Sequence, residues 1–122
     1  MSVEEHYRIV VLCERLAYAT RTGAAEWSRE GEDTFVWAGG EGSVSIGSRD
    51  KDGEAPYELV VLNAKGERLD ELTSQLLDDD RVAEWNEPLA DLYRAARRRG
   101  LLADDVIEAL IEALPQRAAQ AL

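Results

Sequence analysis

The chain has 122 residues, of which 45% are apolar and 32% charged. This length and balance are typical of one folded domain rather than of a disordered segment, so we expect residues 1–122 to form a single domain. Acidic residues outnumber basic ones by 25 to 14, and the net charge of −11 disfavours binding to nucleic-acid phosphates or to anionic membranes.

The first predicted element is a helix over residues 3–21. Ser2 and Glu5 have the spacing of a capping box, and Gly23 follows where a helix commonly ends. The apolar stripe of this helix has helical spacing and consists of Ile9, Leu12, Cys13, Leu16 and Ala19.

Three β-segments follow, over residues 34–38, 43–48 and 57–62. The first is rich in β-branched and aromatic residues, the second alternates serine with apolar residues, and the third is almost continuously apolar. Residues 67–72 predict a further edge strand after the hairpin turn at 63–66. Residues 25–29 are a weaker strand candidate, and the short connections favour an antiparallel meander.

The last third predicts two helices. Asn86 is the expected cap of the first, which ends at Gly100, and Asp104 is the expected cap of the second. Pro115 marks the end of the second helix, and residues 116–122 are expected to be a loosely ordered tail. The apolar stripe of this second helix consists of Val106, Ile107, Leu110, Ile111 and Leu114.

Together these elements predict an α+β fold: an N-terminal helix, a three- to five-stranded antiparallel β-meander and a C-terminal helical hairpin packed on one sheet face. The order of elements resembles that of dimeric secretion chaperones. In this chain, however, no predicted helix divides the strands, so no residue role follows from the resemblance.

A cytoplasmic location is the default expectation. The longest nearly apolar run, residues 9–13, is far too short to cross a bilayer, and the acidic N-terminus is unlike a secretory signal. The single cysteine, Cys13, cannot form an internal disulfide, which agrees with a reducing compartment.

No motif identifies a catalytic, cofactor-binding or metal site, and we expect no cofactor. The stretch Asp50-x-Asp52-Gly53-Glu54 departs from an EF-hand in glycine position and lacks the distal glutamate, so it favours a hairpin loop. His6 and Cys13 are two helical turns apart, too distant to act as base and nucleophile. The one cysteine is expected in the core.

Three groups of residues are candidates for contact with a partner. Large aromatic residues can anchor a protein interface, acidic runs can contact a basic partner, and clustered arginines can meet phosphate or acidic side chains. The candidates are Trp27, Trp85, Asp78, Asp79, Asp80, Arg94, Arg97 and Arg98.

We therefore expect a small acidic regulatory or adaptor protein that acts by protein–protein contact. Its partner would be a basic protein or a second copy of the chain, bound through the open sheet face or the C-terminal hairpin. One alternative is a small enzyme or metal-dependent protein that uses clustered carboxylates. The other is an inhibitor of a basic protein that mimics nucleic acid or acts like an antitoxin.

Overall fold

The computed structural model describes residues 3–75 and 84–115, apart from the side chains of residues 3–6. The elements are α1 (Val3–Arg21), β1 (Ser28–Arg29), β2 (Thr34–Ala38), β3 (Gly42–Ser48), β4 (Tyr57–Asn63), β5 (Arg68–Thr73), α2 (Asn86–Gly100) and α3 (Ala103–Ala113). The predicted α+β fold, with one helix before an antiparallel sheet and two after it, is confirmed.

The five strands form one sheet in the order β1-β2-β3-β4-β5, and every neighbouring pair is antiparallel. The meander is therefore confirmed with five strands, although β1 has only two residues instead of the five expected. In the centre of the sheet, Ile46 pairs with Leu59 and Leu59 with Leu72, so these side chains lie on one face.

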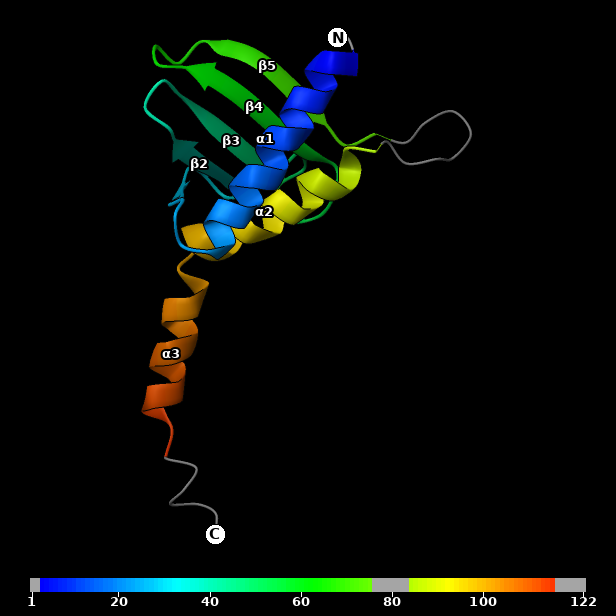
Figure 1. Ribbon diagram of the computed structural model, residues 1–122. Helices are drawn as coiled ribbons and strands as arrows, with labels where there is room; N and C mark the ends of the chain where they lie inside the picture. Colours follow the sequence, from blue (N-terminus) through cyan, green and yellow to red (C-terminus); the bar gives the residue numbers. More distant parts are fainter. Residues whose placement is uncertain (1–2, 76–83, 116–122) are drawn as a thin grey trace.

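Two helices cover that face (Figure 1). Helix α2 contacts strands β1 to β4, and α1 packs against α2. The most deeply buried side chains come from both layers and include Cys13, Phe35, Ile46, Leu59, Leu89 and Leu92. The core thus lies between the helices and the face of the sheet that carries Phe35 and Ile46, and the predicted alternation of serine with apolar residues in 43–48 places Val44 and Ile46 on this face.

Helix α1 ends as its sequence predicts. Gly23 has a φ of 84°, and the backbone N–H of Ala24 bonds to the carbonyl of Ala19 at 2.8 Å. This reversed turn is the helix end that a glycine with positive φ permits.

The predicted caps of the last two helices are wrong. Asn86 holds the backbone of Gln75 through its side-chain amide, at 2.9 and 2.8 Å, and Trp85 precedes the helix without a side-chain cap. Leu102 with a φ of 55° stands before α3, while Asp104 pairs with Arg98. Both polar side chains satisfy tertiary or inter-helix partners instead of their own helix ends.

Helix α3 differs from α2 in its surroundings. It has no buried residue, and Figure 1 shows it extending away from the sheet and the other helices. Its predicted apolar stripe is therefore present but is not part of the core, which ends with α2 and Leu101. Amphipathic spacing indicates that burial of one helix face is favourable, but it does not show that the same chain buries that face.

Some predictions fall outside the described residues: the Ser2 cap, the acidic run Asp78, Asp79 and Asp80, and the tail over 116–122. None of the helices within 3–75 and 84–115 is long and apolar enough to traverse a lipid bilayer.

Candidate protein interaction surface

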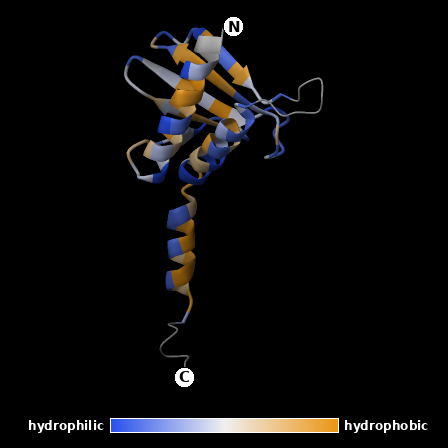
Figure 2. Ribbon diagram, turned by 45° about the vertical axis from the view of Figure 1, so that its right-hand side comes forward, coloured by the Kyte–Doolittle hydropathy of each residue, from blue (hydrophilic) through white to orange (hydrophobic). Residues whose placement is uncertain are grey.

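The junction between α2 and α3 sets the direction of α3. The backbone N–H of Leu101 bonds to the carbonyl of Arg97 at 3.0 Å, and that of Leu102 to the carbonyl of Arg99 at 3.1 Å. These bonds close α2, and the left-handed backbone of Leu102 then redirects the chain. As a result α3 begins at the edge of the folded body and points outward (Figure 2).

One side of α3 is an exposed apolar surface, which we call the α3 face. Its side chains are 45% to 66% exposed and recur at helical spacing, and they are Leu102, Val106, Ile107, Leu110, Ile111 and Leu114. Figure 2 shows this stripe running along the helix. Single exposed apolar residues are normal on a protein, but six on one helix form a contiguous patch of the kind that marks an interaction site.

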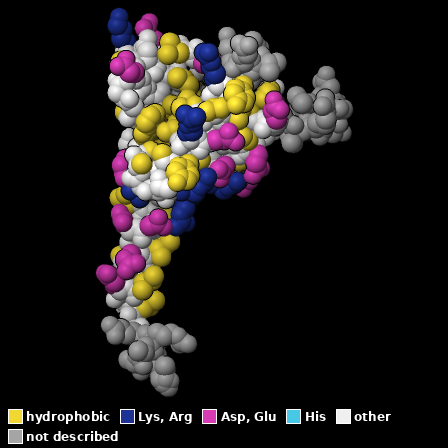
Figure 3. Space-filling model, viewed as in Figure 1, with side chains coloured by type: hydrophobic (Ala, Val, Ile, Leu, Met, Phe, Trp, Pro, Cys, Tyr) yellow, Lys and Arg dark blue, Asp and Glu magenta, His cyan; other side chains and the backbone are white. Residues whose placement is uncertain are grey.

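The opposite side of α3 is acidic and consists of Asp104, Asp105, Glu108 and Glu112. Figure 3 shows acidic side chains along one side of the helix and apolar ones along the other. The helix contains no basic residue, and the side chain of Arg98 at the end of α2 pairs with Asp104. A surface that covers the α3 face would therefore leave most of these acidic side chains on the far side of the helix, with Asp104 beside the apolar stripe.

The arginines of α2 have separate surroundings. Arg94 lies 3.9 Å from Glu87 on the same helix, whereas Arg98 pairs with Asp104 of the following helix. Arg97 is exposed and forms no ion pair with the residues that the structure describes. Arg94 and Arg98 are therefore paired with different carboxylates.

The two tryptophan candidates lie against the core. Trp27 is only 6% exposed, and its indole N–H donates to the hydroxyl of Thr20 at 2.8 Å. Trp85 is partly buried and donates to the carbonyl of Thr73 at 2.9 Å. Trp27 therefore has almost no surface for contact with a partner, and Trp85 is only partly accessible.

Sequence reasoning missed a buried polar cluster around Asp33. The carboxylate accepts hydrogen bonds from the hydroxyl of Tyr93 and, at 2.7 Å, from the backbone N–H of Gly53. Tyr93 stacks on Tyr57 with ring centroids 4.5 Å apart. Burial, and then the bond to Asp33, raise the pKa of Tyr93 above its usual value. Gly53 and Tyr93 are 20 and 60 residues from Asp33 in the sequence, so no local motif predicts these hydrogen bonds.

The loop between β3 and β4 is the predicted hairpin loop. Asp52 accepts hydrogen bonds from the backbone N–H of Glu54 and the hydroxyl of Ser48, both at 3.0 Å, and these bonds lower its pKa. Gly53 has a φ of 79°. Within the described residues, no three His, Cys, Asp or Glu side chains are grouped so that they could hold a metal ion.

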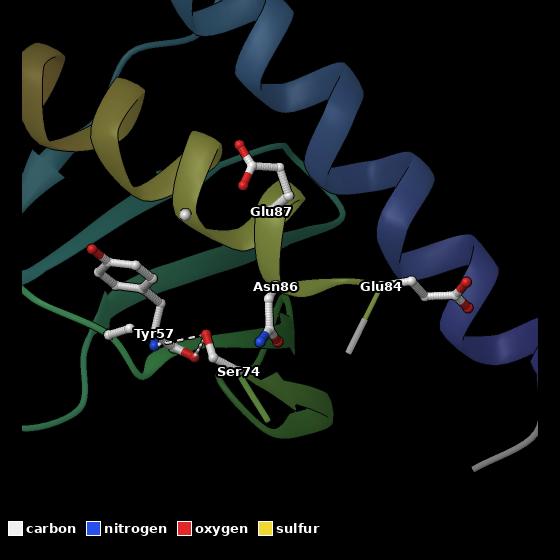
Figure 4. A pocket seen from close by; sticks show the side chains of 7 residues that line it. Tyr57, Ser74, Glu84, Asn86 and Glu87 are labelled. Atoms are coloured by element: carbon white, nitrogen blue, oxygen red, sulfur yellow. Dashed lines mark hydrogen bonds between the residues drawn. The ribbon is translucent and has the colours of Figure 1, made fainter. Parts of the chain in front are cut away.

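A shallow pocket of about 370 Å³ lies between the start of α2 and the ends of β4 and β5. Figure 4 shows the carboxylates of Glu84 and Glu87 pointing in different directions, and Ser74 accepting a hydrogen bond from the backbone of Tyr57. The amide of Asn86 is engaged with Gln75. These polar groups hold the strand end to the helix, and the two acids do not form an acid–base pair.

Cys13 is a core residue, as expected, with no exposed surface. Burial raises the pKa of its thiol to about 12, so the thiolate that would act as a nucleophile is disfavoured.

Comparison with protein-family models, curated proteins and solved structures found no match for this chain.

Proposed function

We propose that this chain is a small acidic regulatory or adaptor protein that acts by protein–protein contact and that the α3 face is its docking surface. The observation that carries the proposal is the exposure of all four large apolar side chains of α3 and of Leu102 and Leu114 at its two ends. Covering a large aliphatic side chain is worth about 1.5–3 kcal/mol when the burial is complete. A partner surface that covers the α3 face gains much of that free energy.

The electrostatics of α3 support the same function. Its charged side chains are all acidic, and the chain as a whole carries a net charge of −11. Such a field favours partner surfaces with basic side chains around an apolar centre and disfavours nucleic acid. An amphipathic helix laid in an apolar groove is one of the recurring forms of protein recognition.

The test is affinity capture with the purified full chain from an extract of the cells that produce it, in three forms. Leu110→Glu places a charge in the middle of the α3 face. Leu69→Glu is the matched control, because Leu69 is also exposed, at 62%, but lies on β5. We expect a protein retained stoichiometrically by the natural chain and by the Leu69 variant, and lost with Leu110→Glu.

Circular dichroism must show that both variants are folded. The proposed function is contradicted if Leu110→Glu changes neither the captured proteins nor the self-association of the chain.

A further inference from the structure

A second apolar stripe lies on the outer side of α1. Tyr7 and Tyr18 are 68% and 69% exposed, and Val11, one turn from Tyr7, is partly exposed. Arg8 and Arg15 are exposed beside this stripe, and neither forms an ion pair among the residues that the structure describes. Figure 3 shows apolar side chains gathered over α1 with basic side chains between them. We call Tyr7, Arg8, Val11, Arg15 and Tyr18 the α1 seat.

We infer that the occupant of the α3 face is a second copy of this chain and that each copy lays α3 on the α1 seat of the other. This inference rests on the proposed function and names the partner of the same surface. Its arrangement is a two-fold dimer, in which both copies give and receive an identical contact. Figure 1 shows α3 extending away from its own α1, so the contact joins two copies.

The two surfaces match in length. Tyr7 and Tyr18 are eleven residues apart, which is about 17 Å along a helix, and Leu102 and Leu114 are twelve apart, about 18 Å. Neither stripe extends beyond the other, so their full lengths can pair.

Charged residues border both surfaces. Asp104 lies where the acidic side of α3 meets the α3 face, and Arg8 and Arg15 border the α1 seat, where the exposed Glu14 lies one turn from Tyr18. Arg8 and Arg15 offset part of the repulsion between two chains with a net charge of −11 each. The apolar contact between the two stripes is therefore the main source of affinity in the proposed dimer.

The buried apolar area comes close to the size of a stable interface. Six half-exposed aliphatic side chains contribute about 300 Å² of apolar surface per α3. Two tyrosines exposed by about two thirds contribute about 250 Å² per seat. Because the dimer contains two such contacts, it covers about 1,100 Å² before the flanking charged side chains are added, against about 1,200–2,000 Å² in specific complexes.

The experiment is sedimentation velocity on the purified full chain at micromolar concentrations. The natural chain and the control Leu69→Glu are expected to be dimers. Leu110→Glu on the α3 face and Tyr18→Glu on the α1 seat are each expected to raise the dissociation constant by about 100-fold or more, because each charge is placed in both contacts of the dimer.

Mixing the two damaged variants is the decisive arm. In a mixed dimer, the intact α3 of the Tyr18→Glu chain lies on the intact seat of the Leu110→Glu chain, so one of the two contacts is restored. We expect the equimolar mixture to contain a heterodimer, seen by native mass spectrometry, at concentrations where each variant alone is a monomer.

Two results would overturn the inference. If the natural chain remains a monomer at about 100 µM, it does not form a dimer with an interface of about 1,100 Å². If Leu110→Glu then still loses a captured protein, the proposed function holds with a different protein as the partner. A dimer that survives Tyr18→Glu but not Leu110→Glu is made by α3 without the α1 seat.

Discussion

The hydroxyl of Tyr93, on α2, donates a hydrogen bond to Oδ1 of Asp33, the residue before β2. The other carboxylate oxygen of Asp33 accepts the backbone N–H of Gly53 from the β3–β4 loop. Asp33 is 7% exposed and Tyr93 is 2% exposed. One buried carboxylate therefore joins a helix, a strand and a loop on the covered side of the sheet.

We expect Asp33→Ala to lower the free energy of unfolding by about 2–4 kcal/mol, because the buried hydroxyl of Tyr93 and the partly buried N–H of Gly53 lose their acceptor. Urea denaturation measures this change. The control is Asp50→Ala, an exposed aspartate of the β3–β4 loop, which is expected to change stability by about 0.5 kcal/mol or less. Equal effects of the two substitutions would show that the Asp33 cluster does not hold the loop to α2.

Stability is expected to fall in strongly alkaline solution. The pKa of Tyr93 is raised in the folded chain, first by burial and then by its bond to Asp33, and that of Tyr57 is also raised, chiefly by burial. A folded state with a raised pKa holds the proton more tightly than the unfolded state. The stabilisation is therefore complete below the unfolded pKa of about 10 and is lost as the pH rises through the folded value.

Urea denaturation at a series of pH values from about 8 to 11 tests this sign. Tyr93→Phe cannot ionise, so its stability is expected to decline less steeply above pH 10 than that of the natural chain. An equally steep decline in both would assign the loss to other groups.

A side chain at position 100 is expected to destabilise the fold. An added Cβ would lie 2.5 Å from Cδ1 of Phe35, a ring with no exposed surface. We expect Gly100→Ala to lower the free energy of unfolding by about 1–3 kcal/mol, as overpacking in a core commonly does.

A double-mutant cycle provides the control. Phe35→Leu removes the ring that the new methyl group would meet, so the cost of Gly100→Ala is expected to shrink in that background. Strictly additive effects would mean that the glycine is needed for a reason other than contact with Phe35.

Much of the fold follows from local sequence. The strand Thr34–Ala38 and the helix Val3–Arg21 have the predicted bounds, because alternation and helical spacing are properties of a few neighbouring residues. The turn at Asn63 is also confirmed: its side-chain oxygen accepts the backbone N–H of Lys65 at 2.9 Å. The predicted caps Asn86 and Asp104 are wrong because each side chain bonds to a partner outside its own helix, Gln75 and Arg98 respectively, which helix signals alone do not reveal.

Cys13 is expected to be unreactive while the chain is folded. It has no exposed surface, and burial raises the pKa of the thiol to about 12. We expect a thiol reagent at pH 8 to modify the native chain at least about 100-fold more slowly than the chain in urea, because the reagent needs an accessible thiolate. Equal rates in both states would place Cys13 at the surface.

The candidate site was only partly foreseen. The spacing of Val106, Leu110 and Leu114 predicted an amphipathic helix, but periodicity does not distinguish a face covered by the sheet from a face left exposed. Trp27 shows the reverse case, since a large aromatic residue beside a loop was a candidate anchor and lies buried against Thr20. In both cases the deciding quantity is exposure, which depends on where distant elements pack.

The central claim is that another protein surface covers the α3 face. A photo-reactive amino acid placed at position 110 of the full chain, with the same group at position 69 as control, tests it directly because both positions are exposed. On irradiation at micromolar concentration, we predict a crosslinked dimer from position 110 only, with the linkage mapped by mass spectrometry to α1 of the second copy. A crosslinking yield at position 110 no higher than at position 69, both in the purified chain and in cell extract, would contradict the claim.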